Sequence, residues 1–490
     1  MNRHACLRLV LWVVLACCAS CVRPWAWPWQ PAAPDAAPTG TVAGESRAEP
    51  APQGVAAPAP QAVPGPGAPP VRDMAVLPQD LTRYVDPIRA NLPLLAPATA
   101  RREAARFETL FFSPWRRTAS AYNATEIYWG VATLGNKTAW GENLRPRPAG
   151  WFEALVAAAD QEHFPSQARP AITVRNTSLR VLPTHHPFFL DFSRAGEGYP
   201  FDYLQNSALW AGTPVFVSHA SADGAWLLAE TAHVWGWLPA RDVAFADAAF
   251  MRAYANGRYV AVLRDGVALA GPKGRHVATA HVGALFPVER VFDDAYSVYV
   301  PLADAAGGAV LGVAHLARMD AAPFPMRLTE ADVARVGNVL LGQAYGWGGL
   351  YENRDCSAML RDLFTPFGLW LPRNSAQQAI AGDMIDVRGL EPPEREALLL
   401  AKGKPFRTLV GLRGHIMLYV GRRDGRAVVF HNTWGVKTVR PGGGPGRAVI
   451  GQAVVTGLQP GLELPDFDPE GDLRWRMEAI TILPAGRLIP

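Results

Sequence analysis

The cysteines of this 490-residue chain are distributed very unevenly, which limits how a fold can be held together. Four of the five lie within the first 21 residues, so Cys356 is the single thiol in everything that follows. One thiol cannot close an intramolecular disulfide, and one thiolate alone seldom holds zinc. The folded part must therefore rely on apolar cores, and 49% hydrophobic residues with 16 tryptophans can supply them. A solitary thiol can also attack a carbonyl carbon.

The N-terminus has the pattern of a secretory signal. Arg3, His4 and Arg8 flank an apolar run over 9–18, and Ala-Ser-Cys then ends at Cys21. The run is too short to cross a bilayer, for which about 20 residues are needed. We predict a signal peptide over 1–21 of the lipoprotein type, with Cys21 as the lipidated residue. A plain signal peptide is the alternative.

A segment poor in aromatic residues follows the signal. Residues 28–70 are dominated by Ala, Pro and Gly, which bury too little apolar surface to offset their ordering entropy. We predict a disordered linker over 22–75. Behind a lipid anchor, such a tether would let the rest of the chain reach a substrate in the periplasm or cell envelope.

The charge balance argues against nucleic acid as a partner. Lys and Arg total 47 against 43 Asp and Glu, which gives a net charge of only +4. No stretch after residue 21 is apolar enough to cross a membrane. His185 and His186 have no nearby cysteine and no ligand spacing, so we expect no metal site.

The body of the chain changes character along its length, which predicts several domains. Residues 76–165 have helical spacing and an aromatic turn, and we interpret them as a helical cap. Short strands at about ten-residue spacing predict one small β-barrel over 166–246 and a second over 247–320. The last segment, 321–490, starts with helices and ends with strands, an α+β layout.

Three residues of this last segment could form a thiol site. Cys356 follows a glycine-rich loop and begins a helix, where the dipole and free N–H groups would lower the pKa of a thiol. His415 starts a strand and His431 ends the next one, so a hairpin could bring the two rings together and let His431 accept the Nδ1 proton of His415. Separately, each residue has an ordinary structural explanation. Together they supply a nucleophile, a base and an orienting group.

The order of motifs resembles the NlpC family of papain-like cell-wall peptidases over about 160 residues. By that resemblance Cys356 is the nucleophile, His415 the general base and His431 the third polar residue. Tyr345 is the family tyrosine near the nucleophile, and the Cys356 backbone N–H is one oxyanion donor. The motifs are Tyr345-Gly-Trp-Gly-Gly, Asp355-Cys356-Ser357, Leu371-Pro-Arg373, Gly414-His415-Ile-Met-Leu-Tyr-Val-Gly421 and Phe430-His431.

The resemblance also implies supporting and substrate-binding positions. Asp355 and Ser357 match positions that shape the substrate groove, and Arg373 belongs to the Leu-Pro-Arg motif. Some members grip a free L-Ala amine with an acidic residue after this motif. Here Asn374 stands at that place, while the following Ser375 agrees with the family.

The upstream part is similar to the bacterial SH3-like domains that precede such peptidases, behind a helical stabilising region. Phe201-Asp-Tyr-Leu-Gln and the following residues carry that similarity, whereas the second barrel matches by position and strand density. Asp202, Tyr203 and Glu230 could compensate for the missing acid by holding the amine.

The resemblance implies a multidomain α+β fold and a cysteine endopeptidase. It would cleave the γ-D-glutamyl–diamino-acid bond of peptidoglycan stem peptides or muropeptides, as a monomer and with no cofactor. Two other functions remain open: a catalytically silent wall-binding scaffold, and a thiol acyltransferase on the same fold.

Overall fold

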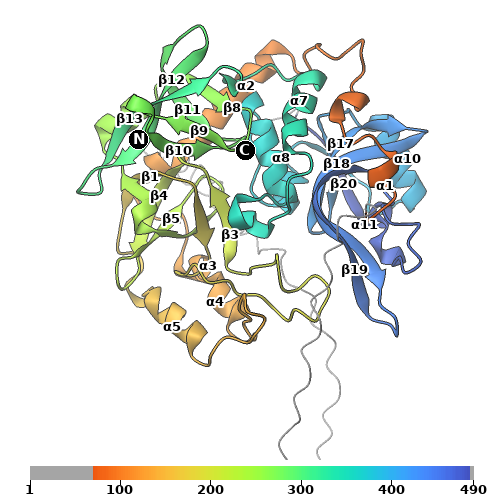
Figure 1. Ribbon diagram of the computed structural model, residues 1–490, viewed down its shortest axis with the longest axis horizontal. Helices are drawn as coiled ribbons and strands as arrows, with labels where there is room; N and C mark the ends of the chain where they lie inside the picture. The colour runs from red at the N-terminus through yellow and green to blue at the C-terminus, as the bar shows by residue number, and fades with distance from the viewer. Residues whose placement is uncertain (1–69, 486–490) are drawn as a thin grey trace, which may run out of the picture. The chain divides into compact units, whose positions relative to one another are not determined.

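The computed structural model describes residues 70–485. The predicted signal peptide over 1–21, the lipidation of Cys21 and the linker up to residue 69 lie outside the described residues. Within residues 70–485 three antiparallel sheets form, together with helices that precede and cover them (Figure 1). This multidomain α+β architecture confirms the fold class expected from the sequence. In the same part of the chain, no helix has the length and apolar character that a membrane crossing requires.

The first part, up to about residue 165, is helical, as its spacing predicts. The longest helix, α2, is amphipathic and turns Phe107 into the protein. The aromatic turn that follows anchors this part to the first sheet, because Trp115 Nε1 donates to the Ala171 carbonyl at 2.7 Å. The helices are α1 (Asp73–Val76), α2 (Pro97–Phe111), α3 (Ala124–Ile127), α4 (Trp129–Leu134) and α5 (Trp151–Ala158), with short 3-10 turns η1 (Leu81–Tyr84), η2 (Ser113–Arg116) and η3 (Gln161–His163).

The first sheet has seven strands in the order β3-β2-β6-β5-β4-β1-β7. One face of the sheet packs into a core of aliphatic residues. The other face packs on the N-terminal helices, and Trp237 on that face is 1% exposed. The strands are β1 (Arg169–Thr173), β2 (Thr177–Arg180), β3 (Gln205–Leu209), β4 (Pro214–Ala220), β5 (Trp226–Glu230), β6 (Trp235–Pro239) and β7 (Val243–Phe245).

The second sheet repeats this size, with seven strands in the order β10-β9-β13-β12-β11-β8-β14. The short helix α6 (Ala248–Tyr254) connects it to the first sheet. Its strands are β8 (Tyr259–Val262), β9 (Val267–Ala270), β10 (His276–Ala280), β11 (Leu285–Val291), β12 (Ala295–Ala303), β13 (Ala309–Ala317) and β14 (Ala321–Pro323).

The third sheet has six strands in the order β15-β20-β16-β17-β18-β19, so four strands consecutive in the chain form a meander. Helices α7 and α8 lie beside it (Figure 1). The helices of this part are α7 (Glu330–Leu340), α8 (Cys356–Phe364), α9 (Ser375–Gln378), α10 (Pro392–Lys402) and α11 (Leu473–Arg476), with 3-10 turns η6 (Trp347–Glu352) and η7 (Thr365–Phe367). The strands are β15 (Asp383–Asp386), β16 (Thr408–Leu412), β17 (His415–Arg423), β18 (Arg426–Val439), β19 (Pro445–Thr456) and β20 (Met477–Ile482).

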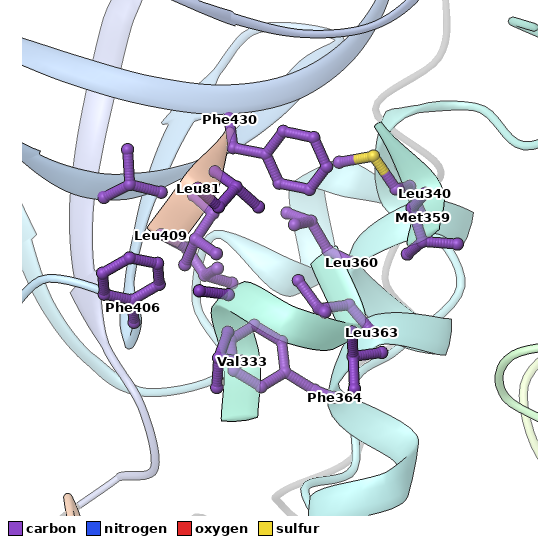
Figure 2. Packing of buried hydrophobic residues seen from close by; sticks show 14 of the residues in the cluster. Leu81, Val333, Leu340, Met359, Leu360, Leu363, Phe364, Phe406, Leu409 and Phe430 are labelled. Atoms are coloured by element: carbon purple, nitrogen blue, oxygen red, sulfur yellow. The ribbon is translucent and has the colours of Figure 1, made fainter. Parts of the chain in front are cut away.

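The main core lies between these two helices and the sheet. Figure 2 shows Leu360 and Leu363 of α8 facing Phe430 of β18, and Leu81 from the N-terminal part packs in the same cluster. Each of these four side chains is 0% exposed. Their burial fixes α8 against the sheet, and the first residue of α8 is Cys356.

Candidate active site

The thiol lies at the first position of α8, because Asp355 caps that helix. Asp355 Oδ1 accepts the Ala358 N–H at 2.8 Å, and the side chain does not take the N–H of Cys356 itself. The backbone N–H of Ile416, the second residue of β17, lies near enough to the Cys356 sulfur to act against the effect of burial on the pKa of the thiol. The N-terminus of α8 and the start of β17 thus both lie next to the sulfur, and Cys356 is only 6% exposed.

The cap is itself fixed by a buried ion pair. Arg373 donates to both carboxylate oxygens of Asp355, at 3.1 and 2.7 Å, and to Ser357 Oγ at 3.1 Å. Its Nε also donates to Ser207 Oγ on β3 at 2.9 Å. The predicted positions Asp355, Ser357 and Arg373 therefore form one network that holds the thiol-bearing helix to the first sheet.

The two histidines predicted for the site lie in contact. His415 Nε2 and His431 Nδ1 are 2.8 Å apart, and the ring centroids are 5.1 Å apart. The sequence interpretation had the other nitrogen of His415 in this bond. That prediction is wrong, because the bond uses Nε2 of His415 and leaves Nδ1 of His415 for another partner.

The hydrogen bonds of Thr456 determine which ring nitrogens of His431 and His415 carry protons. Thr456 Oγ1 donates its only proton to the Gly457 carbonyl at 2.8 Å, so it accepts at 3.0 Å from His431 Nε2. His431 Nδ1 then carries a lone pair and accepts from His415 Nε2. It follows that His415 Nδ1 also carries a lone pair, as a general base must.

Burial dominates the protonation states of the site. Burial, followed by the negative charge of Asp355, raises the pKa of the Cys356 thiol to about 12. The expectation of a lowered thiol pKa is therefore wrong for this closed arrangement. Burial, followed by the charges of His431 and Arg476, lowers the pKa of His415 well below its ordinary value. Thiol and imidazole are both neutral at rest, so attack requires proton transfer to His415.

The glycine-rich loop before the thiol packs against the first sheet. A Cβ on Gly348, whose φ is +63°, would lie 2.1 Å from the Gln205 carbonyl oxygen. Gln205 Nε2 in turn donates to the Gly348 carbonyl at 3.1 Å. Glycine is needed here for the left-handed backbone and for the close approach. Tyr345, at the start of this loop, is 9% exposed, and burial followed by the charge of Cys356 raises its pKa well above the ordinary value.

A cavity of about 140 Å³ opens beside the two imidazoles. Aromatic rings form one wall, since Phe201 lies 6.3 Å from Tyr345 and 6.1 Å from Trp434 between ring centroids. The lining residues include three cations and no carboxylate; the cations are Lys437, Arg447 and Arg476.

The predicted amine-binding residues have other roles. Asp202 and Glu230 are each 0% exposed and pair with arginines, at 2.6 Å to Arg180 and 2.8 Å to Arg117. Because both carboxylates are enclosed and already paired, we do not place them in the substrate site. Tyr203 does not line the cavity; its ring lies 5.1 Å from that of Trp347, which in turn lies 5.9 Å from the ring of Phe201.

The position where an acid was expected acts as a helix cap. Asn374 Oδ1 accepts the Gln377 N–H at 2.9 Å, at the start of the short helix α9 whose first residue is Ser375. Ser375 is partly exposed. Neither residue is among those that line the cavity beside the imidazoles.

Sequence reasoning missed four residues of the site: Trp434, Arg447, Thr456 and Arg476. Thr456, Arg447 and Arg476 belong to β19 and α11, and no motif marks them, because only the folded meander brings these elements to His431. Trp434 follows His431 by three residues and could have been noted from its place in the sequence.

A thiol at a helix N-terminus, set against an imidazole pair on an adjoining meander, defines the papain-like class of cysteine peptidase fold. Comparison with known families agrees in four consecutive parts of the chain. Residues 48–164 match the NLPC_P60 stabilising domain, residues 187–239 an SH3 domain of SH3b1 type, residues 247–290 an SH3 domain of SH3b2 type, and residues 342–440 the NlpC/P60 family.

This chain belongs to the NlpC/P60 family, with an N-terminal stabilising domain and two bacterial SH3b domains. A solved NlpC/P60 endopeptidase from Photobacterium damselae subsp. piscicida is 26% identical, with a TM-score of 0.73 over 84% of this chain and 95% of that one. A curated relative, the γ-D-glutamyl-L-lysine dipeptidyl-peptidase of Bacillus subtilis strain 168, is 29% identical over 114 residues. That alignment covers 23% of this chain and 36% of the relative, so the chain spans about a third of its length.

Proposed function

We propose that this protein hydrolyses the amide bond between γ-D-glutamate and the following diamino acid in peptidoglycan stem peptides. The observation that carries the proposal is the hydrogen-bonded series Thr456–His431–His415, which leaves a basic nitrogen at the strand start that meets the Cys356 sulfur. The Bacillus relative, named for a γ-D-glutamyl-L-lysine substrate, supports this choice of bond.

The reaction takes two steps. Cys356 Sγ attacks the γ-carbonyl carbon while His415 Nδ1 takes the thiol proton, and the Cys356 N–H at the helix start stabilises the oxyanion. The C–N bond breaks as His415 returns the proton to the leaving amine. Water, deprotonated by His415, then attacks the thioester, so that a C–O bond forms, the C–S bond breaks and the thiol is restored.

The family suggests an extracytoplasmic location, which agrees with a cell-wall substrate. The lipid anchor on Cys21 stays a prediction from the sequence. Intact-mass measurement of the membrane fraction tests it: a diacylglycerol adduct on Cys21 is expected, and its absence would contradict the anchor.

The test of activity uses defined peptides. Disaccharide-peptides and free stem peptides are incubated with the full chain and with Cys356→Ala, and products are mapped by mass spectrometry. We expect a new free amine on the diamino acid with the wild type alone. Identical product profiles for both proteins would overturn the proposal, and an acyl product formed only with added amines would favour acyl transfer.

A further inference from the structure

Two arginines face the cavity beside the imidazoles without a carboxylate partner. Arg447 comes from β19 and Arg476 ends α11, and both are enclosed on most of their surface. Among residues 70–485, no Asp or Glu oxygen lies within ion-pair distance of either guanidinium. Arg447 Nε is buried and has no hydrogen-bond partner in this part of the chain.

The most buried arginines of residues 70–485 are satisfied by the protein itself, Arg395 by several backbone carbonyls and the others by carboxylates. Arg180 pairs with Asp202 at 2.6 Å, Arg354 with Asp362 at 2.8 Å, and Arg373 with Asp355 at 2.7 Å. A buried cation without a partner destabilises a fold, so such groups are normally neutralised by the protein itself. Arg476 donates one bond, at 3.3 Å, to the Arg413 carbonyl, which neutralises no charge.

The two guanidiniums line the same cavity as His415 and Tyr345. Burial, followed by the charge of Arg476, lowers the pKa of Arg447, and the charge of Arg476 also reaches His415. The charge of Arg447 likewise acts to lower the pKa of Tyr345, against the larger effect of burial. The pair therefore repel each other next to the reacting atoms, an arrangement that an anion between them would stabilise.

The third cation of the cavity does not share this property. Lys437 Nζ lies 3.1 Å from Glu470 Oε2, so its charge is already paired. The unpaired positive charge of the cavity thus belongs to Arg447 and Arg476 alone among its lining residues.

We propose that Arg447 and Arg476 form a carboxylate-binding subsite that holds a free carboxylate of the substrate peptide beside the scissile bond. This inference rests on the proposed function and deepens it, since it makes an anionic peptide the preferred substrate. A planar guanidinium binds a carboxylate through two parallel hydrogen bonds, which would fix the position of the bond to be cut. The carboxylate has two possible sources: the α-carboxylate of the γ-linked glutamate, and a carboxylate of the diamino acid.

The experiment compares four matched stem peptides. Each of the two carboxylates is present either as the acid or as the neutral carboxamide, and kcat and KM are measured for the full-length wild type, Arg447→Gln, Arg476→Gln and the double variant. Arg440→Gln is the matched control, because Arg440 belongs to the exposed end of the same β18–β19 hairpin. Thermal melting checks folding.

The wild type and the control are expected to prefer the acid by about 10- to 100-fold in kcat/KM at one of the two positions. Arg447→Gln and Arg476→Gln should lose that preference, so that the ratio of kcat/KM for the acid to kcat/KM for the carboxamide falls to about 1, while the carboxamide is still cleaved. That residual cleavage shows that the variants are folded and active. The position at which the preference disappears identifies the source of the carboxylate.

The outcomes separate the subsite from the function itself. Equal cleavage of all four peptides by the wild type, or an undiminished acid preference in the double variant, would refute the subsite and leave the peptidase activity standing. If the wild type cleaves none of the four peptides, the proposed function fails, and the subsite fails with it. Equal loss of acid and carboxamide cleavage in well-folded variants would also count against the subsite.

Discussion

At the scale of single residues, one hydroxyl determines where the protons of the candidate site lie. Thr456 gives its proton to a backbone carbonyl and thereby makes His431 a donor at Nε2 and an acceptor at Nδ1. His431 acts on the reaction through its 2.8 Å bond to His415 and is a positioning residue. Another side chain that places a hydrogen-bond acceptor at the same distance from His415 should be able to replace His431.

Substitution of His431 tests this role. We expect His431→Ala to lower kcat by about 10²- to 10⁴-fold, because His415 loses the partner that fixes its tautomer. His431→Asn supplies a carbonyl oxygen as acceptor and should keep kcat within about 10-fold of the wild type. Steady-state kinetics on a γ-D-glutamyl peptide provide the measurement. Equal losses in both variants would show that His431 does more than accept a hydrogen bond.

The raised pKa of Cys356 predicts how the free thiol reacts. A thiol with a pKa of about 12 is protonated at neutral pH, and its thiolate fraction rises tenfold per pH unit until that value. The rate of alkylation by iodoacetamide should therefore climb steadily from pH 6 to pH 10. A plateau near pH 7 would instead reveal a preformed thiolate paired with an imidazolium.

At the scale of elements, the loop η6 connects the thiol to the first SH3b domain. The sequence marked this loop by its glycines and placed it correctly before a helix. The partner could not be read from the sequence, because the contact with Gln205 on β3 joins residues 143 positions apart. Helices and strands with strong periodicity were predictable for the same reason that the core forms, namely that one face of each is apolar.

Gly348→Ala tests the fit of this loop. The new methyl group would meet the Gln205 carbonyl and force a side chain into a left-handed backbone, so we expect a loss of about 2–4 kcal/mol in the free energy of unfolding. Gly389→Ala is the control, since a Cβ there meets nothing within 4 Å and its φ is not positive. Denaturant melts compare the two variants, and equal stabilities would contradict the close packing.

Some elements were not predicted. Helix α10 and the long strand β19 carried no motif. Because β19 supplies Thr456 and Arg447, these two residues of the site were not predicted either. The bounds predicted for the individual domains stay predictions.

At the scale of the whole molecule, three domains meet at one buried guanidinium. Arg354 of the peptidase domain donates to Asp265 in the second SH3b domain and to Asp362 on α8, and its guanidinium lies 5.3 Å from the ring of Trp210 in the first. Close by, the ring of His281 lies 4.6 Å from that of Trp210, tilted by 30°, and His281 Nε2 lies 3.0 Å from Glu352 Oε2. No single-domain pattern in the sequence indicates such a junction.

The junction should make stability depend on pH. Burial alone would lower the pKa of His281, but its bonds to Asp265 and Glu352 outweigh burial and raise the pKa to about 9. Since this value exceeds the ordinary 6.5, the stabilisation is complete below about pH 6.5 and disappears as the pH rises through 9. The melting temperature of the wild type should fall over this range.

His281→Gln should show a flatter dependence over the same pH range, whereas His276→Gln should behave as the wild type. His276 is an exposed histidine of the same domain, on β10. Melting curves at pH 6, 7.5 and 9.5 make the comparison, and parallel slopes for wild type and His281→Gln would refute the linkage.

Chains of several modules are often treated as parts that recombination can exchange freely. Here Arg354 has its counter-ions in two modules and its aromatic neighbour in a third. A graft of the peptidase module onto a foreign partner would remove Asp265 and Trp210 and leave the buried Arg354 with Asp362, a counter-ion that Arg361 also shares. Successful chimeras should therefore transplant Asp265 and Trp210 together with the catalytic part, or replace Arg354 by a neutral residue of similar volume.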